Sequence, residues 1–437
     1  MFYAIILNEI KYMNILSIAL KGLKEIIDEK KSYHIVMVDF KNQYNFTKDD
    51  FSILSKTIQG TIRHFFLLRY QATNLFNDFE EDDDEIYLIC LAIYQIRYLK
   101  KEIASFIVIN DTIQTNEDYL LRLDNSQIKE NLKFVSENKF NLPTHILSDV
   151  YKYDSLTFST PLWLIQLWAK EYGDDILLNL LHTNRNKRPS YLQINQLKST
   201  KEELLKENIY LDISDVDNGL IYSGINSLTS LQDYKQGKIY SLDLTNQIIL
   251  EKINLDYGDQ VLHLSSIKGD LTSYLGCKLI ELNEKIDTNS NNEISYRQGK
   301  YLYQRLGLKN VTSYLSNIDY LRTYLRYDNY DKVFTTPNSS DLGKISRKPG
   351  LLLTLKKNDI DMYSSNQYLE LCEADKYLKV GGQLIYIIYT ITLEETTNVI
   401  SKFIDNHQNY NLVEQKQIFP YDNNSDGAYY AILEKGE

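Results

Sequence analysis

The first third of the chain carries apolar side chains at helical spacing. Two stripes recur at three- and four-residue intervals: Leu54, Ile58, Ile62, Phe65 and Phe66, and further along Ile86, Ile89, Ile93 and Ile96. This period is typical of amphipathic helices that pack one face against a core. Residues from about 14 to 130 are therefore predicted to form successive helices, and their apolar stripes are interpreted as core rather than as a binding surface.

The chain from Gly237 onward changes to short, largely apolar runs separated by helical pattern. The runs at 261–264, 332–334 and 384–388 have the composition of strands that are buried on both faces. Strands that alternate with helices in this way indicate a parallel sheet with helices on both sides. We predict a doubly wound α/β sheet here, preceded by an all-α domain.

A further helix is predicted between these regions. Ser159 or Thr160 suits its N-cap, Pro161 suits its first turn, and Gly173 suits its end. The length of 437 residues allows two to four domains, each large enough to bury a core.

Composition and charge restrict the classes of partner. The chain has 43% hydrophobic and 24% charged residues, which is ordinary for a globular protein, and a net charge of -11. Such a charge argues against sequence-independent binding of nucleic acid, so any RNA contact must be local. The best local basic group comprises Arg185, Lys187, Arg188, Lys198 and Lys201. The 36 tyrosines accompany abundant Asn, Ile and Lys, so tyrosine content by itself is weak evidence for base stacking.

Metal sites and membrane segments are not indicated. Cys90, Cys277 and Cys372 have neither paired nor regular spacing, which suits a reduced compartment and argues against structural zinc. No apolar run reaches membrane-spanning length, and the N-terminus is a poor signal peptide. We therefore expect a cytoplasmic protein without a bound metal.

Two glycine-containing segments carry the candidate chemistry. Residues 381–395 read GGQLIYIIYTITLEE, and residues 335–343 read TTPNSSDLG. Their frames resemble the two active-site motifs of the RsmB-type 16S rRNA (cytosine-C5) methyltransferases, GGxLVYSTC and DAPCSGLG. Tyr389 and Asn338 stand where the resemblance places the two cysteines, and Thr335 stands where it places the aspartate.

The resemblance extends over nearly the whole chain and implies three domains. They are a NusB-like helical domain at 1–135, a small α+β RNA-binding module at 150–232, and a Rossmann-like methyltransferase domain at 233–437. The family's usual start matches Met13-Asn14, so residues 1–12 precede it. The segment 426–431, DGAYYA, resembles the family's closing strand.

The resemblance also implies S-adenosylmethionine as cofactor and ribosomal RNA as partner. The cofactor positions that it implies are Ser265, Lys268, Gly269, Leu271, Ser290 (or Asn289), Asn317 and Thr335. The glycine-rich turn keeps only Gly269, and no carboxylate stands at the ribose or adenine position unless Asp287 or Asp319 takes that place. The RNA contacts that it implies are Arg185, Arg188, Asn195, Arg347 and Lys348; for the loop at 347–349 a solvated loop is an equal alternative.

A cysteine thiolate is the usual nucleophile for attack on cytosine C6, and a tyrosine of ordinary pKa needs strong activation. Cys277 and Cys372 are interpreted as buried hydrophobes, and His263 as structural. We therefore expect a family member that has lost cytosine-C5 catalysis and acts by binding RNA or in ribosome assembly. The alternatives are an active methyltransferase with a divergent site, and an interaction module that binds a transcription or ribosomal protein through the NusB-like domain.

Overall fold

The computed structural model describes residues 14–437, so the expected start at Met13 lies outside the described part. The chain forms two compact units. The first contains the described residues up to 177 together with 348–355, and the second contains 178–347 and 356–437. Within residues 14–437, no helix combines the length and the apolar character needed to cross a bilayer.

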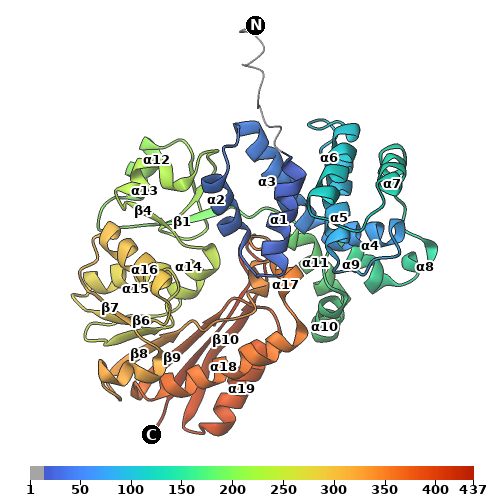
Figure 1. The fold of residues 1–437 in the computed structure, drawn as a ribbon. Coiled ribbons are helices and arrows are strands. Elements are labelled where there is room, and N and C mark those ends of the chain that lie inside the picture. Colours follow the sequence, from blue (N-terminus) through green and yellow to red (C-terminus); the bar gives the residue numbers. More distant parts are fainter. Residues whose placement is uncertain (1–13) are drawn as a thin grey trace. The chain divides into compact units, whose positions relative to one another are not determined.

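The first unit is a helical bundle, as predicted from the apolar stripes (Figure 1). Its helices are α1 (Ile15–Ile27), α2 (Tyr33–Gln43), α3 (Lys48–Arg63), α4 (Phe65–Leu75), α5 (Asp84–Tyr98), α6 (Ser105–Asp118), α7 (Asn125–Glu137), α8 (Thr144–Leu147), α9 (Val150–Phe158), α10 (Leu162–Tyr172) and the returning α17 (Leu351–Thr354). Helix α5 is buried along most of its length and contacts α1, α3, α4, α6 and α7. It is therefore the central helix, which explains why apolar residues occur on all its faces.

The boundary expected at residue 150 lies inside this first unit. Helix α9 packs against α4, and the Ser159 hydroxyl accepts a hydrogen bond from the Phe66 backbone N–H at 3.0 Å. Gly173 ends α10 as predicted, but Pro161 is itself the N-cap rather than a first-turn residue, and Ser159 is the C-cap of α9 rather than the N-cap of α10. The predicted helix is confirmed, but it belongs with the helical bundle rather than with the small module.

The small module has a four-stranded antiparallel sheet with strand order β2-β3-β1-β4. Its elements, with the helix α11 that precedes them, are α11 (Asp174–Asn184), β1 (Ser190–Ile194), α12 (Lys201–Glu207), β2 (Leu211–Ile213), β3 (Gly219–Tyr222), η1 (Leu228–Ser230), α13 (Gln232–Lys235) and β4 (Ile239–Ser241). Because β4 pairs with β1 and completes the sheet, the module extends beyond the expected boundary at 232.

The C-terminal part forms a seven-stranded sheet with order β10-β11-β9-β8-β5-β6-β7. Its strands are β5 (Val261–Leu264), β6 (Ile286–Ser290), β7 (Val311–Leu315), β8 (Tyr330–Thr335), β9 (Leu378–Ile388), β10 (Tyr410–Ile418) and β11 (Ala428–Lys435). Strands β7, β6, β5, β8 and β9 are parallel, and β11 is antiparallel to both of its neighbours. The predicted Rossmann-like sheet is thus confirmed, including the predicted strand at 261–264.

Helices cover both faces of this sheet. The helices of this part are α14 (Leu244–Glu251), α15 (Asp270–Glu281), α16 (Glu293–Leu306), η2 (Ile318–Thr323), η3 (Leu342–Lys344), α18 (Lys357–Asp375), η4 (Leu393–Glu395) and α19 (Thr397–Asn406). One core cluster contains residues of α14, α15 and α16, and another contains residues of α18 and α19. Figure 1 shows α18 and α19 side by side along the sheet. This layering leaves the carboxyl ends of the parallel strands as one edge at which loops converge.

Gly343→Ala is expected to destabilise the second unit. A Cβ at Gly343 would lie 1.9 Å from the carbonyl oxygen of Gly427, and backbone cannot move aside as a flexible side chain can. We expect a loss of about 2 kcal/mol in the free energy of unfolding, measured by urea titration. Gly350→Ala is the control, because its Cβ meets only the Ile26 side chain, at 3.3 Å, and should change stability little. Equal stability of the two variants would contradict the close backbone crossing.

Candidate cofactor pocket and nucleophile position

The loop that follows β5 has the strained backbone of a tight strand-to-helix turn. Ser265, Lys268 and Gly269 have φ values of 56°, 61° and 78°. A Cβ at Gly269 would lie 2.7 Å from the Tyr303 hydroxyl and 2.8 Å from the Gly299 Cα. The glycine is therefore required for the left-handed backbone and for close packing of α15 against α16, whether or not a cofactor binds.

His263, at the end of β5, has no accessible ring nitrogen. Its Nδ1 lies 2.7 Å from the Thr272 hydroxyl and its Nε2 lies 3.0 Å from the Thr336 hydroxyl. Burial lowers the pKa of the imidazole to about 3, so the ring is neutral at physiological pH. These contacts agree with the structural interpretation of His263 and leave it no route to act as a base.

A pocket of about 500 Å³ opens at the carboxyl ends of β5, β6, β7 and β8. It is lined by Ser265, Asn289, Asn291, Asn317, Ile318, Asp319, Pro337, Asn338, Met362, Tyr363, Asn366, Leu369, Glu370 and Glu373. Ser265, Asn289 and Asn317 were expected here from the sequence. Lys268 is exposed outside the lining, while Leu271, Ser290 and Thr335 are buried behind it. The pocket thus lies where a doubly wound sheet binds its ligand.

Glu370, which sequence analysis did not identify, occupies the centre of this site. Its carboxylate accepts hydrogen bonds from the Ser265 hydroxyl, at 2.7 Å, and from the Thr335 hydroxyl. Burial raises the pKa of the carboxyl group, against the lowering effect of those two hydrogen bonds. The sequence did contain a signal for Glu370. Its spacing places this charged residue next to the helix face that carries the buried Gln367, Leu371 and Ala374.

The expected ribose-binding position holds an amide that binds the protein itself. The Asn289 side chain accepts a hydrogen bond from the Ser265 N–H and donates one to the Ser316 carbonyl, both at 3.0 Å. Ser290 donates to the Ser266 carbonyl at 2.7 Å. Of the two acids considered as substitutes, Asp287 accepts from the Tyr330 hydroxyl at 2.8 Å and does not line the pocket, whereas Asp319 does line it.

Tyr389, at the expected position of the nucleophile, is a packed neutral phenol. Its hydroxyl donates to the Asn246 side chain at 2.9 Å, and the Lys344 ammonium lies 3.2 Å from the ring centroid. Burial raises the pKa of the Tyr389 phenol well above 10. The Asn338 side chain is exposed, and the Thr335 hydroxyl is bound to Glu370. None of these three side chains carries the thiol or the carboxylate that the resemblance places at its position.

A buried carboxylate nevertheless holds the two motif segments together. Glu395 accepts hydrogen bonds from the Ser340 N–H at 2.9 Å, the Gln367 amide at 3.0 Å, and the Thr390 and Thr392 hydroxyls at 3.1 Å. Four donors satisfy a fully buried charge. The scaffold that would position the reacting groups is therefore intact.

No cysteine replaces the missing nucleophile. Burial raises the pKa of Cys277, on α15, to about 12, and it also raises the pKa of Cys372, on α18. Cys90 lies in the core of the helical unit, where burial raises its pKa too. Within residues 14–437, no group of three or more His, Cys, Asp or Glu side chains is arranged to hold a metal ion.

Three of the five expected RNA contacts are bound to other parts of the protein, and of these Asn195 and Arg188 are buried whereas Arg347 is exposed. Asn195 is 0% exposed and donates to the carbonyls of Gly237 and Leu306, each at 2.9 Å. Arg188 is buried and donates to Asn424 at 3.0 Å. Arg347 binds Asp426 at 2.7 Å and Asp243 at 2.8 Å. Arg185 and Lys348 are exposed.

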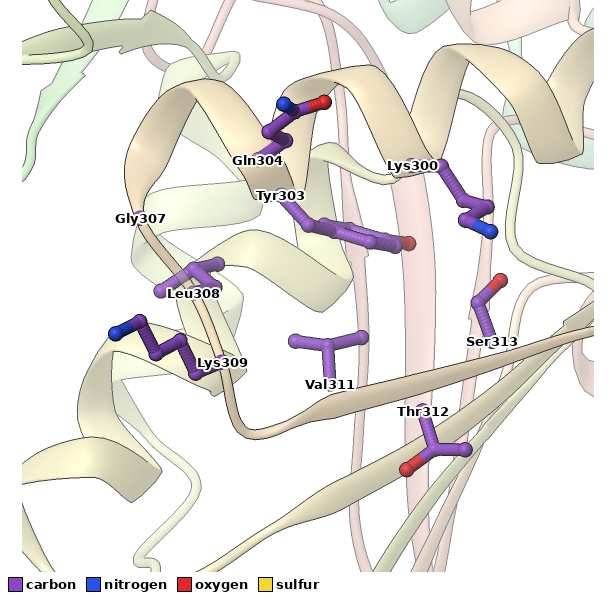
Figure 2. Close-up of a pocket in the computed structure, with 9 residues that line it drawn as sticks. All are labelled: Lys300, Tyr303, Gln304, Gly307, Leu308, Lys309, Val311, Thr312 and Ser313. Carbon is purple, nitrogen blue, oxygen red and sulfur yellow. The ribbon is translucent and has the colours of Figure 1, made fainter.

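A second cavity, an open groove of about 480 Å³, lies between α16 and the edge strand β7. Figure 2 shows the Tyr303 ring pointing into it between Lys300 and Lys309. The lining contains these two lysines and no acidic residue. The groove is at the start of β7, whereas the first pocket is at the ends of the strands.

Comparisons with known proteins agree with this geometry. A family model described as 16S rRNA methyltransferase RsmB/F matches residues 250–434. A probable ribosomal RNA small subunit methyltransferase B from Coxiella burnetii is 24% identical over 418 residues, covering 89% of this chain and 93% of the relative. The corresponding protein from Proteus mirabilis is 23% identical over 436 residues, covering 97% of this chain and 99% of the relative.

Among solved structures, the crystal structure of PH0851 superposes with a TM-score of 0.80 at 17% identity, covering 98% of this chain and 100% of that one. The crystal structure of NSun6 from Pyrococcus horikoshii with SFG covers 63% of this chain and 98% of its own, with a TM-score of 0.58 at 16% identity. Both show the fold. Residues 250–434 therefore match the RsmB/F 16S rRNA methyltransferase family model, and nearly the whole chain is similar to ribosomal RNA small subunit methyltransferases B.

Proposed function

We propose that this protein binds ribosomal RNA without methylating cytosine C5. The observation that carries the proposal is the state of Tyr389, a neutral phenol covered by Lys344 and bonded to Asn246. Methyl transfer to C5 needs a covalent bond at C6, because the unactivated ring carbon is too weak a nucleophile. A phenol whose pKa lies well above 10 supplies no such bond near neutral pH.

The pocket does not fit S-adenosylmethionine as a methyl-donor site. Its volume suits a nucleoside, but the position for the ribose hydroxyls holds the Asn289 amide, which already binds Ser265 and Ser316. The Glu370 carboxylate stands against the loop after β5, where it would repel the carboxylate of the cofactor's amino-acid end. We therefore infer weak or absent cofactor binding.

The RNA contacts retained from the sequence interpretation are Arg185 and Lys348, whose side chains are exposed. Arg188, Asn195 and Arg347 support them indirectly, because each holds backbone or side chains inside the protein. Phosphate contacts fix position without reading sequence, so this group explains binding but not the choice of site. The rRNA target is inferred from the similarity to ribosomal RNA small subunit methyltransferases.

Methyl transfer provides the direct test of this function. Purified protein with tritiated S-adenosylmethionine and either deproteinised 16S rRNA or small subunits should leave RNA radioactivity at background, because no thiolate is present. The Proteus mirabilis relative serves as the positive control. Tritium recovered as 5-methylcytosine from the reaction with this protein would refute the proposal.

Restoring the family residues alone should not restore activity. In Thr335→Asp/Asn338→Cys/Tyr389→Cys, the new aspartate would face the Glu370 carboxyl group that Thr335 now binds. Two carboxyl groups sharing one site repel each other, and a misplacement of about 1 Å can cost on the order of a hundredfold in rate. We expect background methyl transfer in the tritium assay.

Adding Glu370→Gln to that triple variant is the matched comparison, because it removes the repulsion without changing the size of the side chain. If the triple variant itself methylates RNA, the pocket is competent and only the nucleophile was lost. Circular dichroism of both variants checks that each is folded.

A further inference from the structure

Residues 318–327, here named the Tyr/Arg segment, expose aromatic rings and arginines in alternation. The segment follows β7 and begins with η2. Tyr320, Tyr324 and Tyr327 are 67%, 59% and 43% exposed. Arg322 and Arg326 are exposed between them. Large rings are usually buried at least in part, so three exposed tyrosines within eight residues form an unusual surface.

The segment is held rigidly from below. Leu321 and Leu325 are buried in the core cluster shared with α18, and the backbone N–H of Leu325 donates to the Leu321 carbonyl at 2.9 Å. The Tyr324 ring rests 5.2 Å from the Tyr314 ring, and the Tyr327 ring rests 5.1 Å from the buried Tyr377 ring. Ring contacts on one side leave another face open, so these two rings are positioned before any ligand arrives.

The arginines of the Tyr/Arg segment lie between two acids, Asp319 within it and Asp328 directly after it. The segment carries two arginines and one acid, Asp319, in a chain of net charge -11. Among residues 14–437, neither Arg322 nor Arg326 forms an ion pair. A guanidinium that has no carboxylate partner is available to bind phosphate or to stack on a base.

The groove of Figure 2 extends this surface toward the start of β7. Its Lys300 and Lys309 are exposed, and its lining contains no acid. Strand β7 is the last strand of the sheet and has five residues, which span about 17 Å. Basic groups therefore precede this edge strand, and aromatic rings with arginines follow it.

We propose that the β7 edge, made of the Tyr/Arg segment and the groove lysines Lys300 and Lys309, binds unpaired RNA. The tyrosines stack on exposed bases, and the arginines and lysines contact the backbone phosphates. This inference rests on the proposed RNA-binding function and names a surface for it. The partner is single-stranded, because a ring can stack only on a base whose face is not already covered within a duplex.

The test measures fluorescence anisotropy of a labelled, unstructured 12-nucleotide RNA and of a duplex of equal length. Tyr320→Ala/Tyr324→Ala should weaken single-strand binding at least fivefold, because each stacked ring contributes measurably to affinity. Tyr320→Phe/Tyr324→Phe, the matched control, should bind like the unaltered protein, since it keeps both rings. Thermal unfolding of each variant checks that the fold is unchanged.

Lys300→Ala/Lys309→Ala tests the phosphate contacts separately. Removing two phosphate contacts should reduce the slope of log affinity against log salt by about 1.4, at about 0.7 per contact on single strands. An unchanged slope would show that Lys300 and Lys309 do not contact the RNA phosphates. If the unaltered protein binds no RNA, both the RNA-binding function and this surface are wrong. Two results would refute only the stacking surface. In the first, Tyr320→Ala/Tyr324→Ala binds single-stranded RNA as tightly as the unaltered protein; in the second, its affinity for the duplex falls as much as its affinity for the single strand.

Discussion

The half-buried carboxyl group of Glu370, which lines the pocket, makes the hydrogen bonds on which the candidate site depends. It is presented by α18 and accepts hydrogen bonds from Ser265, after β5, and from Thr335, at the end of β8. A carboxyl group removed from water must find such partners, because leaving it unsatisfied costs several kcal/mol. It therefore joins two neighbouring strands at the edge of the sheet where a nucleotide cofactor would otherwise be held.

Other polar side chains near Glu370 are also hydrogen-bonded within the protein. Asn289 joins the loop after β5 to the loop after β7, and His263 is bound at both ring nitrogens by threonine hydroxyls. Glu395 meanwhile holds the two motif segments in place with four donors. Side-chain hydrogen bonds that need no ligand therefore join the loops after β5 and β7 and the end of β8 to one another.

Sequence analysis predicted the fold well because the fold depends on period and turn chemistry. The run at 261–264 is β5 with the same bounds, and Pro161 and Gly173 flank α10. The expected boundary at 232 lies before β4, since the sheet partner of so short a strand is not visible in sequence. Motif frames located Ser265, Asn289 and Asn317 at the pocket.

The contacts of individual side chains were harder to predict. Asn195 and Arg347 look like surface contacts in a motif, yet they bind carbonyls and carboxylates contributed by residues that are distant in sequence. Glu370 and Lys344 were missed for the same reason, because each acts on a residue that the chain brings close only after folding. The exposure of Tyr320 and Tyr324, which Tyr257 and Tyr301 share, likewise could not be predicted from a sequence so rich in tyrosine.

The central claim is that Ser265, Asn289 and Glu370, which line the pocket, are already bound within the protein and leave no site for a cofactor, and calorimetric titration with S-adenosylmethionine tests it most directly. We expect no saturable heat of binding up to millimolar cofactor. The Asn289 amide at the ribose position is already hydrogen-bonded to Ser265, and the Glu370 carboxylate beside the loop after β5 would repel the carboxylate of the cofactor. A micromolar dissociation constant, equivalent to about -8 kcal/mol, would contradict the account and show that other groups in the pocket hold the cofactor.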